Sequence, residues 1–258
     1  MHTLTLMIST LNEGILRMEN AVKVVHPQIK YLIIHQNNCK KELPSFLKRK
    51  DIEVISTQTT GLSKSRNIGL RNCKTTYAII GDDDVEYLEK GIAKVLEIIK
   101  TEAPDFAAFK IKTPDGEPEF KEYSTEKYSF ETHYPAIASI EILINIEKIK
   151  SKKVAFDERF GLGTRLRQGE EEIFIKDLIK NNLKGFYYPI FLVKHPFEST
   201  GTKPIKESLK YFLKGAFSKR THQKIMMPNF DSPFRELKNK IFFYLGKVYI
   251  LVTKRTYL

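Results

Sequence analysis

Short apolar runs alternate with amphipathic segments along the first 110 residues of the chain. Four runs are rich in Ile, Leu and Val and end in polar or turn residues, which is typical of buried strands; they span residues 4–9, 31–35, 52–56 and 77–81. Helical spacing predicts helices at about residues 14–25, 62–72 and 88–100. Strands that alternate with helices predict a doubly wound α/β fold with a mostly parallel sheet.

The pattern weakens after residue 110. Residues 111–137 contain three prolines and suggest a loop-rich segment over the sheet. A strand at 140–145, a short helix, a helix at about 169–181 and a strand at 185–195 follow. These elements complete a predicted α/β domain of residues 1–200.

Residues 201–258 form a basic extension with two amphipathic segments, 204–220 and 234–252. In the second segment the apolar residues recur at helical spacing: Phe234, Leu237, Ile241, Leu245, Val248 and Val252. From Lys203 onward there are thirteen Lys and Arg against three acids, so +10 of the net charge of +12 lies here. Two interpretations stay open. The helices pack on the main domain or on a partner subunit, as in a homodimer, or they rest on anionic lipid.

Composition bounds the class of protein. A chain of 258 residues with 41% hydrophobic residues can bury a sizeable core. Cys39 and Cys73 form no CxxC pair and indicate free thiols in a reducing compartment. A signal-like basic start and an apolar run of membrane-spanning length are both lacking in the sequence, which predicts a cytoplasmic protein. It would be peripheral on the inner face of a membrane if the extension binds lipid.

Polar residues follow three of the predicted strands, at residues 9–13, 36–38 and 82–84. In a parallel sheet, ligands bind outside the carboxyl ends of the strands. We therefore expect these three clusters to lie around one crevice.

The cluster at residues 82–84 consists of three consecutive aspartates, whose charges repel one another. The aspartates can occupy a solvated turn that caps the next helix. Alternatively, they can bind a hard cation such as Mg²⁺ or Mn²⁺, which takes one or two carboxylates and completes its shell with phosphate oxygens and water. The residues alone leave both interpretations open.

Three further features have both a structural and a functional interpretation. Glu170–Glu172 lie at a predicted helix start, where acids complement the helix dipole, or one of them is a general base. His195 ends a strand and is either structural or a metal ligand. Residues 59–70 place Gly61 and several basic residues at a helix start, which is either a charged surface helix or an anion site.

Taken in order, these segments resemble the family 2 glycosyltransferases with a GT-A fold. STLNE ends the first strand, where the family has a Thr-Tyr-Asn-like turn, and GLSKSRNIGL is close to its Gly-Leu-Ser-x-Ala-Arg-Asn segment. GDDDV matches the Asp-x-Asp motif, FDERFGLGTRLRQGEEEIF matches the stretch from Phe-Asp-Glu-x-Phe to Gly-Glu-Asp, and VKHP follows a late strand. The resemblance covers roughly residues 3–200. It implies an inverting, nucleotide-sugar-dependent glycosyltransferase with a nucleotide-binding N-terminal half.

The resemblance implies a metal and donor site. Asp84, with Asp82 as a second acid, would hold Mn²⁺ or Mg²⁺ against the donor diphosphate, and His195 would complete that site. Asp83 would approach the ribose or sugar, and Arg66 would contact the phosphates or ribose.

The resemblance also implies a nucleoside pocket and a base. Thr10, Asn12 and Glu13 would line the pocket. Glu171 falls on the position of the catalytic Asp of the family and would deprotonate an acceptor hydroxyl for attack on the anomeric carbon. Because Glu replaces Asp within a run of three, Glu170 is the alternative base.

The sequence leaves several donor nucleotides and acceptors open. Gln36 and Asn37 stand where the family often has an Asp that contacts the base, so UDP-, GDP- and TDP-sugars all remain candidates. A saccharide or lipid-linked acceptor, in bacterial surface polysaccharide or glycolipid synthesis, would suit such an enzyme.

Three rival hypotheses belong to other classes of protein. A GT-A-like protein without catalysis would bind a sugar nucleotide and turn nothing over. A basic nucleic-acid-binding protein is disfavoured, because the charge is confined to the extension and no nucleic-acid motif is present, so we expect no nucleic acid partner. A metal-dependent nucleotidyltransferase is disfavoured because no Gly-rich phosphate loop follows the first strand.

Overall fold

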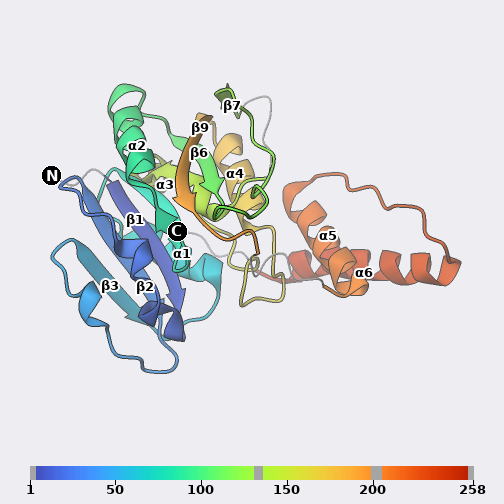
Figure 1. Ribbon diagram of the computed structural model, residues 1–258. Helices are drawn as coiled ribbons and strands as arrows, with labels where there is room; N and C mark the ends of the chain where they lie inside the picture. Colours follow the sequence, from blue (N-terminus) through green and yellow to red (C-terminus); the bar gives the residue numbers. More distant parts are fainter. Residues whose placement is uncertain (1–3, 131–135, 199–204, 255–258) are drawn as a thin grey trace.

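In the described part of the chain, nine strands form one sheet around which the protein is built (Figure 1). The structure is a computed structural model that describes residues 4–130, 136–198 and 205–254. The strands lie in the order β3-β2-β1-β4-β8-β6-β9-β5, and β7 pairs with β9. Their bounds are β1 Leu4–Leu11, β2 Ile29–Gln36, β3 Ile52–Thr57, β4 Tyr77–Asp82, β5 Glu86–Tyr87, β6 Phe106–Lys112, β7 Tyr128–Ser129, β8 Ile142–Asn145 and β9 Gly185–Lys194.

Most strands of the sheet run in one direction. β1 to β4 pair in parallel, β8 runs against β4, and β6 and β9 again run with the first four. Six of the nine strands therefore point one way, while β5, β7 and β8 point the other. This arrangement confirms the predicted α/β class with its mostly parallel sheet.

Helices cover both faces of the sheet. The α-helices are α1 Leu62–Asn72, α2 Glu89–Thr101, α3 Ile146–Ser151, α4 Glu170–Lys180, α5 Glu207–Thr221 and α6 Pro233–Val252. The 3₁₀ turns are η1 Asn12–Leu16, η2 Asn20–Val22, η3 Ser45–Leu47 and η4 Ser139–Glu141. One apolar core joins the sheet to η1, η2 and α2, and a second core joins the opposite face to α1, α3 and α4.

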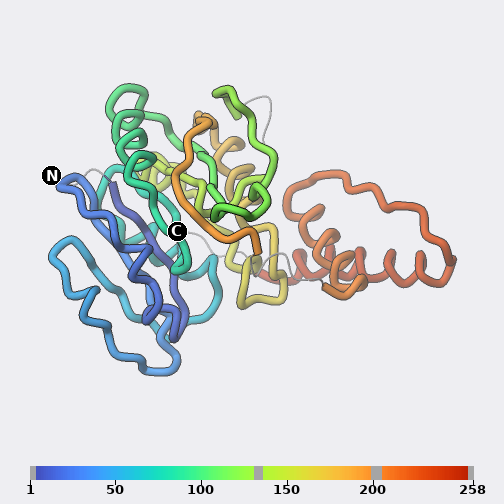
Figure 2. The backbone as a smooth tube through the Cα atoms, viewed as in Figure 1, coloured from blue at the N-terminus to red at the C-terminus, as the bar shows by residue number. Residues whose placement is uncertain are grey.

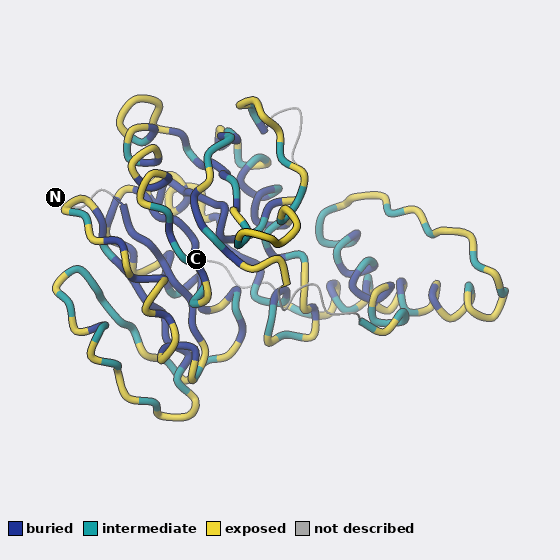
Figure 3. The backbone as a smooth tube through the Cα atoms, in the orientation of Figure 1, coloured by how far each residue is buried: buried dark blue, intermediate teal, exposed yellow. Residues whose placement is uncertain are grey.

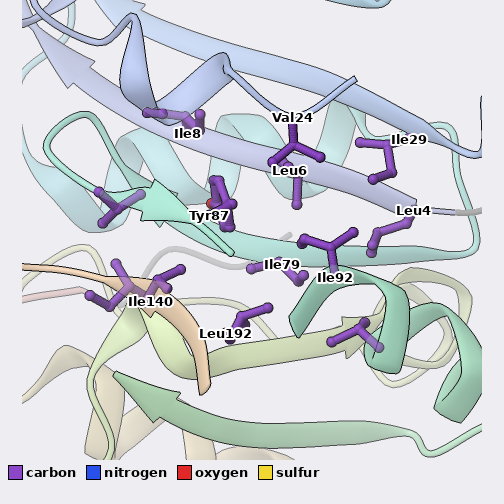
Figure 4. Close-up of a cluster of buried hydrophobic side chains, with 14 of the residues drawn as sticks. Leu4, Leu6, Ile8, Val24, Ile29, Ile79, Tyr87, Ile92, Ile140 and Leu192 are labelled. Carbon is purple, nitrogen blue, oxygen red and sulfur yellow. The ribbon is translucent and has the colours of Figure 1, made fainter. Parts of the chain in front are cut away.

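The two cores follow from the alternation of side chains along each strand. Leu4, Leu6 and Ile8 of β1 belong to the same core as Ile92 of α2 (Figure 4), whereas Met7 belongs to the core on the other face. The strands of the N-terminal half read as continuous apolar runs because both of their faces are buried.

Two predicted elements differ from the structure. The prediction of a helix at residues 14–25 is wrong, since the chain forms the short 3₁₀ turns η1 and η2 there. A Cβ at Gly14 would overlap the Asp83 carboxylate, so this segment is held against the turn after β4 and tertiary packing overrides helical spacing. The strand expected at residues 140–145 begins at Ile142, because η4 occupies the residues before it.

The two helices predicted for the extension are present as α5 and α6, and they pack on each other as a hairpin. A third apolar core joins the hairpin to the body, with Phe160, Leu166 and Ile173 on one side and residues such as Phe212 and Ile250 on the other. Figure 2 shows the segment that contains residues 160–169 (yellow) where the hairpin meets the body. In the part of the chain that the structure describes, α5 and α6 included, no helix has both the length and the apolar character needed to cross a bilayer.

Candidate active site

β1, β2 and β4 are neighbours in the sheet and end at the same edge. In the pairing register, Ser9 lies beside Asp82, and Leu11 lies beside Gln36. The three polar clusters that follow these strands therefore meet, as the sequence predicts, at the carboxyl ends of parallel strands.

The acidic turn begins with Asp82, the last residue of β4, and continues through Asp83 and Asp84. Thr10, near the end of β1, donates a hydrogen bond to Asp83 Oδ2. Burial raises the pKa of Asp83, and the Thr10 hydroxyl opposes this shift. Gly14 closes over the same carboxylate, because a side chain at that position would overlap it. Asp83 is thus held inside the turn, whereas the Asp84 side chain is 65% exposed.

His195 follows β9 and faces the acidic turn. Its Nε2 lies 3.5 Å from Asp84 Oδ1. Its Nδ1 lies 2.6 Å from the carbonyl oxygen of Pro196, which can only accept a hydrogen bond, so Nδ1 carries the proton. Burial disfavours the imidazolium, but Asp84, together with the Pro196 carbonyl and Asp82, favours it more and raises the pKa of His195. The hydrogen bond from His195 in turn lowers the pKa of Asp84.

The chemistry of these donors fits a divalent cation that is shared with a ligand. When neutral, His195 presents its Nε2 lone pair toward Asp84, as a metal-binding histidine does when its other nitrogen donates to a carbonyl. Among the described residues, no three His, Cys, Asp or Glu side chains are grouped as a metal site. A cation at Asp84 and His195, with Asp82 as the third candidate, would complete its shell with phosphate oxygens and water.

Arg66 lies in α1 and links the two acidic clusters. Its side chain is 1% exposed, and its Nη2 donates to Ser139 Oγ at 2.7 Å and lies 3.4 Å from Asp82 Oδ1. Its Nη1 lies 3.2 Å from Glu171 Oε1 and 3.6 Å from Glu170 Oε1. The family resemblance implies that Arg66 contacts the donor phosphates or ribose. In the structure its guanidinium lies among the carboxylates of Asp82, Glu170 and Glu171.

Glu170 and Glu171 begin α4 after Gly169, whose φ of 98° suits glycine. The Glu170 side chain is 5% exposed, and its Oε2 has no hydrogen-bond partner among the residues that the structure describes. Burial, aided by the charge of Glu171, raises the pKa of Glu170 to about 8, although Arg66 opposes the shift. Glu171 is 21% exposed, so a ligand can reach its carboxylate from solvent.

Ser139 is a site residue that the sequence does not indicate. Its hydroxyl accepts from Arg66 at 2.7 Å and lies 3.4 Å from Asp82 Oδ2. Glu141, in the same 3₁₀ turn, is fixed by Tyr123, which donates to Oε1 at 2.7 Å, and by Lys121, which donates to Oε2 at 2.5 Å. The loop-rich segment thereby anchors η4, and a cavity of about 280 Å³ lined in part by these residues lies beside it. A lone serine in an irregular segment carries no sequence signal for such a role.

The segments around α1 and before α4 hold each other in place. Asn67 receives a hydrogen bond from Phe156 N at 2.9 Å, and its Nδ2 donates to Phe156 O at 2.9 Å and to Glu158 at 3.0 Å. Ser63 donates to Phe160 O at 2.7 Å. These bonds bring Arg66 of α1 to the glutamates of α4, although about 100 residues separate them in the chain.

The residues expected around the nucleoside make mostly local contacts. Asn12 Oδ1 accepts from the backbone of Asn38 at 2.9 Å. Glu13, exposed at the surface, pairs with Lys41 at 2.8 Å, which lowers the pKa of Glu13. The Asn37 amide donates to and accepts from the Lys41 backbone at 2.8 and 2.7 Å, so it closes a loop.

Gln36 is buried at the end of β2. Its Nε2 donates to Thr59 Oγ1 and to Gly61 O, each at 3.2 Å. These bonds tie β2 to the start of α1. Because Gln36 pairs with Leu11 in the register of β1 and β2, it lies at the same edge of the sheet as Thr10 and the acidic turn.

The sheet order, the acidic turn after β4 and the glutamates joined to it by one arginine define a GT-A glycosyltransferase core. The match to a family model agrees with this class: the chain belongs to glycosyl transferase family 2, whose model matches residues 5–161. That match includes Arg66 and the acidic turn and ends before α4.

Crystal structures of TarS from S. aureus share the fold. The 1–349 fragment in complex with UDP-GlcNAc has a TM-score of 0.63 at 11% identity, over 96% of this chain and 73% of that chain. The same fragment in complex with UDP has a TM-score of 0.60 at 13% identity, over 98% and 75%. No curated protein sequence matches the chain.

Proposed function

We propose that this glycosyltransferase moves a sugar from a nucleoside-diphosphate donor to an acceptor hydroxyl with inversion at the anomeric carbon. The observation that carries the proposal is the contact of one buried guanidinium with both acidic clusters. Arg66 lies 3.4 Å from Asp82 and 3.2 Å from Glu171, so the turn that would face the diphosphate and the carboxylate that would face the acceptor are neighbours.

The donor is a sugar nucleotide, and we favour a UDP-sugar. Its support is the common fold with TarS, whose crystal structures contain UDP-GlcNAc and UDP. The diphosphate would lie at the carboxyl ends of β1 and β4, near Asp84 and His195, and the nucleoside would extend toward Thr10, Asn12 and Gln36.

A divalent cation, Mn²⁺ or Mg²⁺, would be held by Asp84 and His195, with Asp82 as a third ligand. When bound, it would stabilise the negative charge that develops on the departing diphosphate. Neutral His195 would contribute its Nε2 lone pair, because Pro196 holds the proton on Nδ1.

Glu171 is the better candidate for the general base. Glu170 is buried and, with a pKa raised to about 8, holds a proton at neutral pH, so it is a poor proton acceptor there. Glu171 is partly exposed, so an acceptor can reach its carboxylate from solvent, and its Oε1 lies 3.2 Å from Arg66 Nη1. It would take the proton of the acceptor hydroxyl as that oxygen attacks the anomeric carbon and the bond to the diphosphate breaks.

The first experiment is thermal unfolding with UDP-, GDP- and TDP-sugars, with and without Mn²⁺. A ligand at 100 times its Kd stabilises the folded state by about 2.7 kcal/mol. We expect one donor, a UDP-sugar, to raise the Tm only when Mn²⁺ is present. Asp84→Ala should abolish the rise, and Asp115→Ala, which changes a surface side chain that is 92% exposed, should leave it intact.

Activity separates catalysis from binding. Glu171→Gln should keep the donor-dependent rise in Tm and lose transfer by two to four orders of magnitude, the usual contribution of a general base. A wild-type protein that binds the donor but never cleaves it would instead support a binding protein without catalysis. No rise in Tm with any of the three donors would contradict the proposed site.

A further inference from the structure

Helix α6 carries a continuous apolar stripe on its solvent side. Eight large apolar side chains of this helix are between 49% and 77% exposed: Phe234, Leu237, Ile241, Tyr244, Leu245, Val248, Leu251 and Val252. At 100° per residue they fall within an arc of about 120° on one side of the helix. Exposed apolar residues that are scattered singly need no explanation, but a contiguous stripe of this kind marks an interaction surface.

The stripe is not the face that packs in the structure. Asn239, Phe243, Gly246 and Ile250 are the buried residues of α6, and they lie on the opposite side of the helix. That opposite face meets α5, where a Cβ on Gly246 would lie 2.8 Å from Ala216 N. Figure 3 shows the outer part of the hairpin mostly as exposed and intermediate chain. The regular apolar spacing of this segment therefore does not serve the core of the protein.

Basic residues border the stripe on both sides. Lys238 lies at one edge, and Lys240 and Lys247 lie at the other, whereas the arc itself contains no charged residue. Glu236 is the one acid in α6, and its carboxylate is bonded to Lys240 at 2.5 Å. The extension as a whole carries thirteen Lys and Arg against three acids. A partner of this surface must therefore be apolar at its centre and negatively charged around it.

A second copy of the chain matches this chemistry poorly. Part of the stripe, Phe234 to Leu251, has the alternating three- and four-residue spacing of a coiled coil. Coiled-coil partners need opposite charges at the flanking positions, but those positions here hold lysine or apolar residues. Pairing two α6 helices would bring lysines together without an acid to neutralise them.

We propose that α6 lies flat in the headgroup region of an anionic membrane, with the stripe buried among the acyl chains and the bordering lysines at the lipid phosphates. A helix of this kind binds by buried apolar area together with attraction to anionic lipid. The inference rests on the surface of α6 and is independent of the proposed donor site.

Binding to vesicles is the first test. Full-length protein should sediment with phosphatidylcholine vesicles that contain 30% phosphatidylglycerol and much less with pure phosphatidylcholine. Replacing Ile241 and Val248 by Ser should weaken binding about tenfold or more, because two exposed apolar anchors are lost. Val25→Ser, at an exposed valine of the main domain, is the matched control and should bind normally. Lys238→Gln with Lys240→Gln should reduce binding about fivefold per charge.

A fluorescence reporter tests the orientation. The chain contains no tryptophan, so Tyr244→Trp places a single indole within the stripe. Its emission should shift to the blue on addition of anionic vesicles and should be quenched by brominated acyl chains. Val25→Trp, the control on the main domain, should show neither change.

Several results would overturn the proposal. The first is a lack of vesicle binding at low salt by a protein that still unfolds cooperatively. The second is equal binding by the Ile241/Val248 variant. The third is a dimer in solution that the same variant dissociates, without vesicle binding, which would identify a second copy as the partner. None of these results affects donor-dependent stabilisation of the main domain, so failure of this proposal is distinguishable from failure of the proposed function.

Discussion

Glu170 is the residue whose environment departs most from that of an ordinary surface glutamate. Its carboxyl is enclosed by α1, α4 and Gly161, whose Cβ would lie 3.1 Å from Glu170 Oε1. Burial and the neighbouring Glu171 favour its neutral form more than Arg66 favours its charged form. Buried carboxyls of this kind are costly to ionise, and the cost depends on pH.

We expect Glu170→Gln to become more stable than wild type as the pH rises. Folding raises the pKa of Glu170 from 4.5 to about 8. The folded state therefore binds this proton more tightly than the unfolded state, and the resulting stabilisation is complete below pH 4.5 and is lost as the pH rises toward 8. Relative to wild type, the variant should gain on the order of 3–4 kcal/mol between pH 5 and pH 8.

Urea unfolding of both proteins at pH 5 and pH 8 measures this difference. Glu172→Gln is the control, because the Glu172 side chain is 45% exposed and pairs with Lys176 at the surface. Its stability relative to wild type should change little between the two pH values. A Glu170→Gln protein with the same pH dependence as wild type would show that Glu170 is ionised in the folded state at pH 5.

Sequence reasoning at this scale finds residue types better than it finds their partners. The acidic turn lies where three strand ends meet, because the period of the apolar runs fixes the strands and the parallel sheet fixes their common edge. Neither Ser139 beside Arg66 nor the burial of Glu170 has a signal in the sequence. Both depend on how the 139–141 turn and the 156–169 segment fold over α1.

At the scale of elements, strands buried on both faces are easy to predict from their apolar runs, whereas the turn η1 and the packed face of α6 are not. Helical spacing at residues 14–25 predicts a helix that contact with the acidic turn prevents. In α6 the pattern gives the right helix, but its regular apolar face is the exposed one. The packed face is instead set by Gly215 of α5 and Gly246 of α6, which let the two helices approach closely.

The close approach of α5 and α6 predicts that Gly246→Ala destabilises the hairpin. In an open helix this change stabilises by roughly 0.5–1 kcal/mol. Here the new Cβ would overlap the carbonyl oxygen of Phe212 and lie 2.8 Å from Ala216 N, so the helices must move apart. Overpacking of this kind typically costs 1–3 kcal/mol.

Amide hydrogen exchange measures the effect where it arises. Exchange should accelerate in α5 and α6 of the Gly246→Ala protein, while β1, β2 and β4 exchange as in wild type. A Gly246→Ala protein with slower exchange in the hairpin would mean that the helices already have room for the methyl group. The close packing described for this pair would then be wrong.

At the scale of the whole molecule, the hairpin and the active site share one segment of chain. Residues 156–160 hold α1 through Asn67 and Ser63, and Asp157 within that segment holds the hairpin. Asp157 is fully buried and accepts from Arg159 at 2.7 Å and from Arg220 of α5 at 2.7 Å. The predicted boundary near residue 200 separates two units in sequence that contact each other closely in space.

Because Arg220 joins these units, its removal should loosen both. Burial disfavours the charge of Asp157, but Arg159 and Arg220 lower its pKa, so the carboxylate depends on both cations. Arg220 also donates to Asp177 of α4 at 2.5 Å. Breaking a buried ion pair from one side typically costs 3–5 kcal/mol. Since Arg159 remains, we expect Arg220→Met to lose about 2–3 kcal/mol in urea unfolding.

The matched control is Arg235→Met, which breaks an ion pair with Glu207 on the outside of the same hairpin, where the Arg235 side chain is 48% exposed. Exposed pairs contribute about 0–1 kcal/mol, so this control should stay close to wild type.

In the Arg220→Met protein, hydrogen exchange should also accelerate in residues 156–169 and in α1, because Asp157 lies between Phe156 and Glu158, which bind Asn67. A loss confined to α5 and α6 would mean that the hairpin is attached to the active-site segment without supporting it.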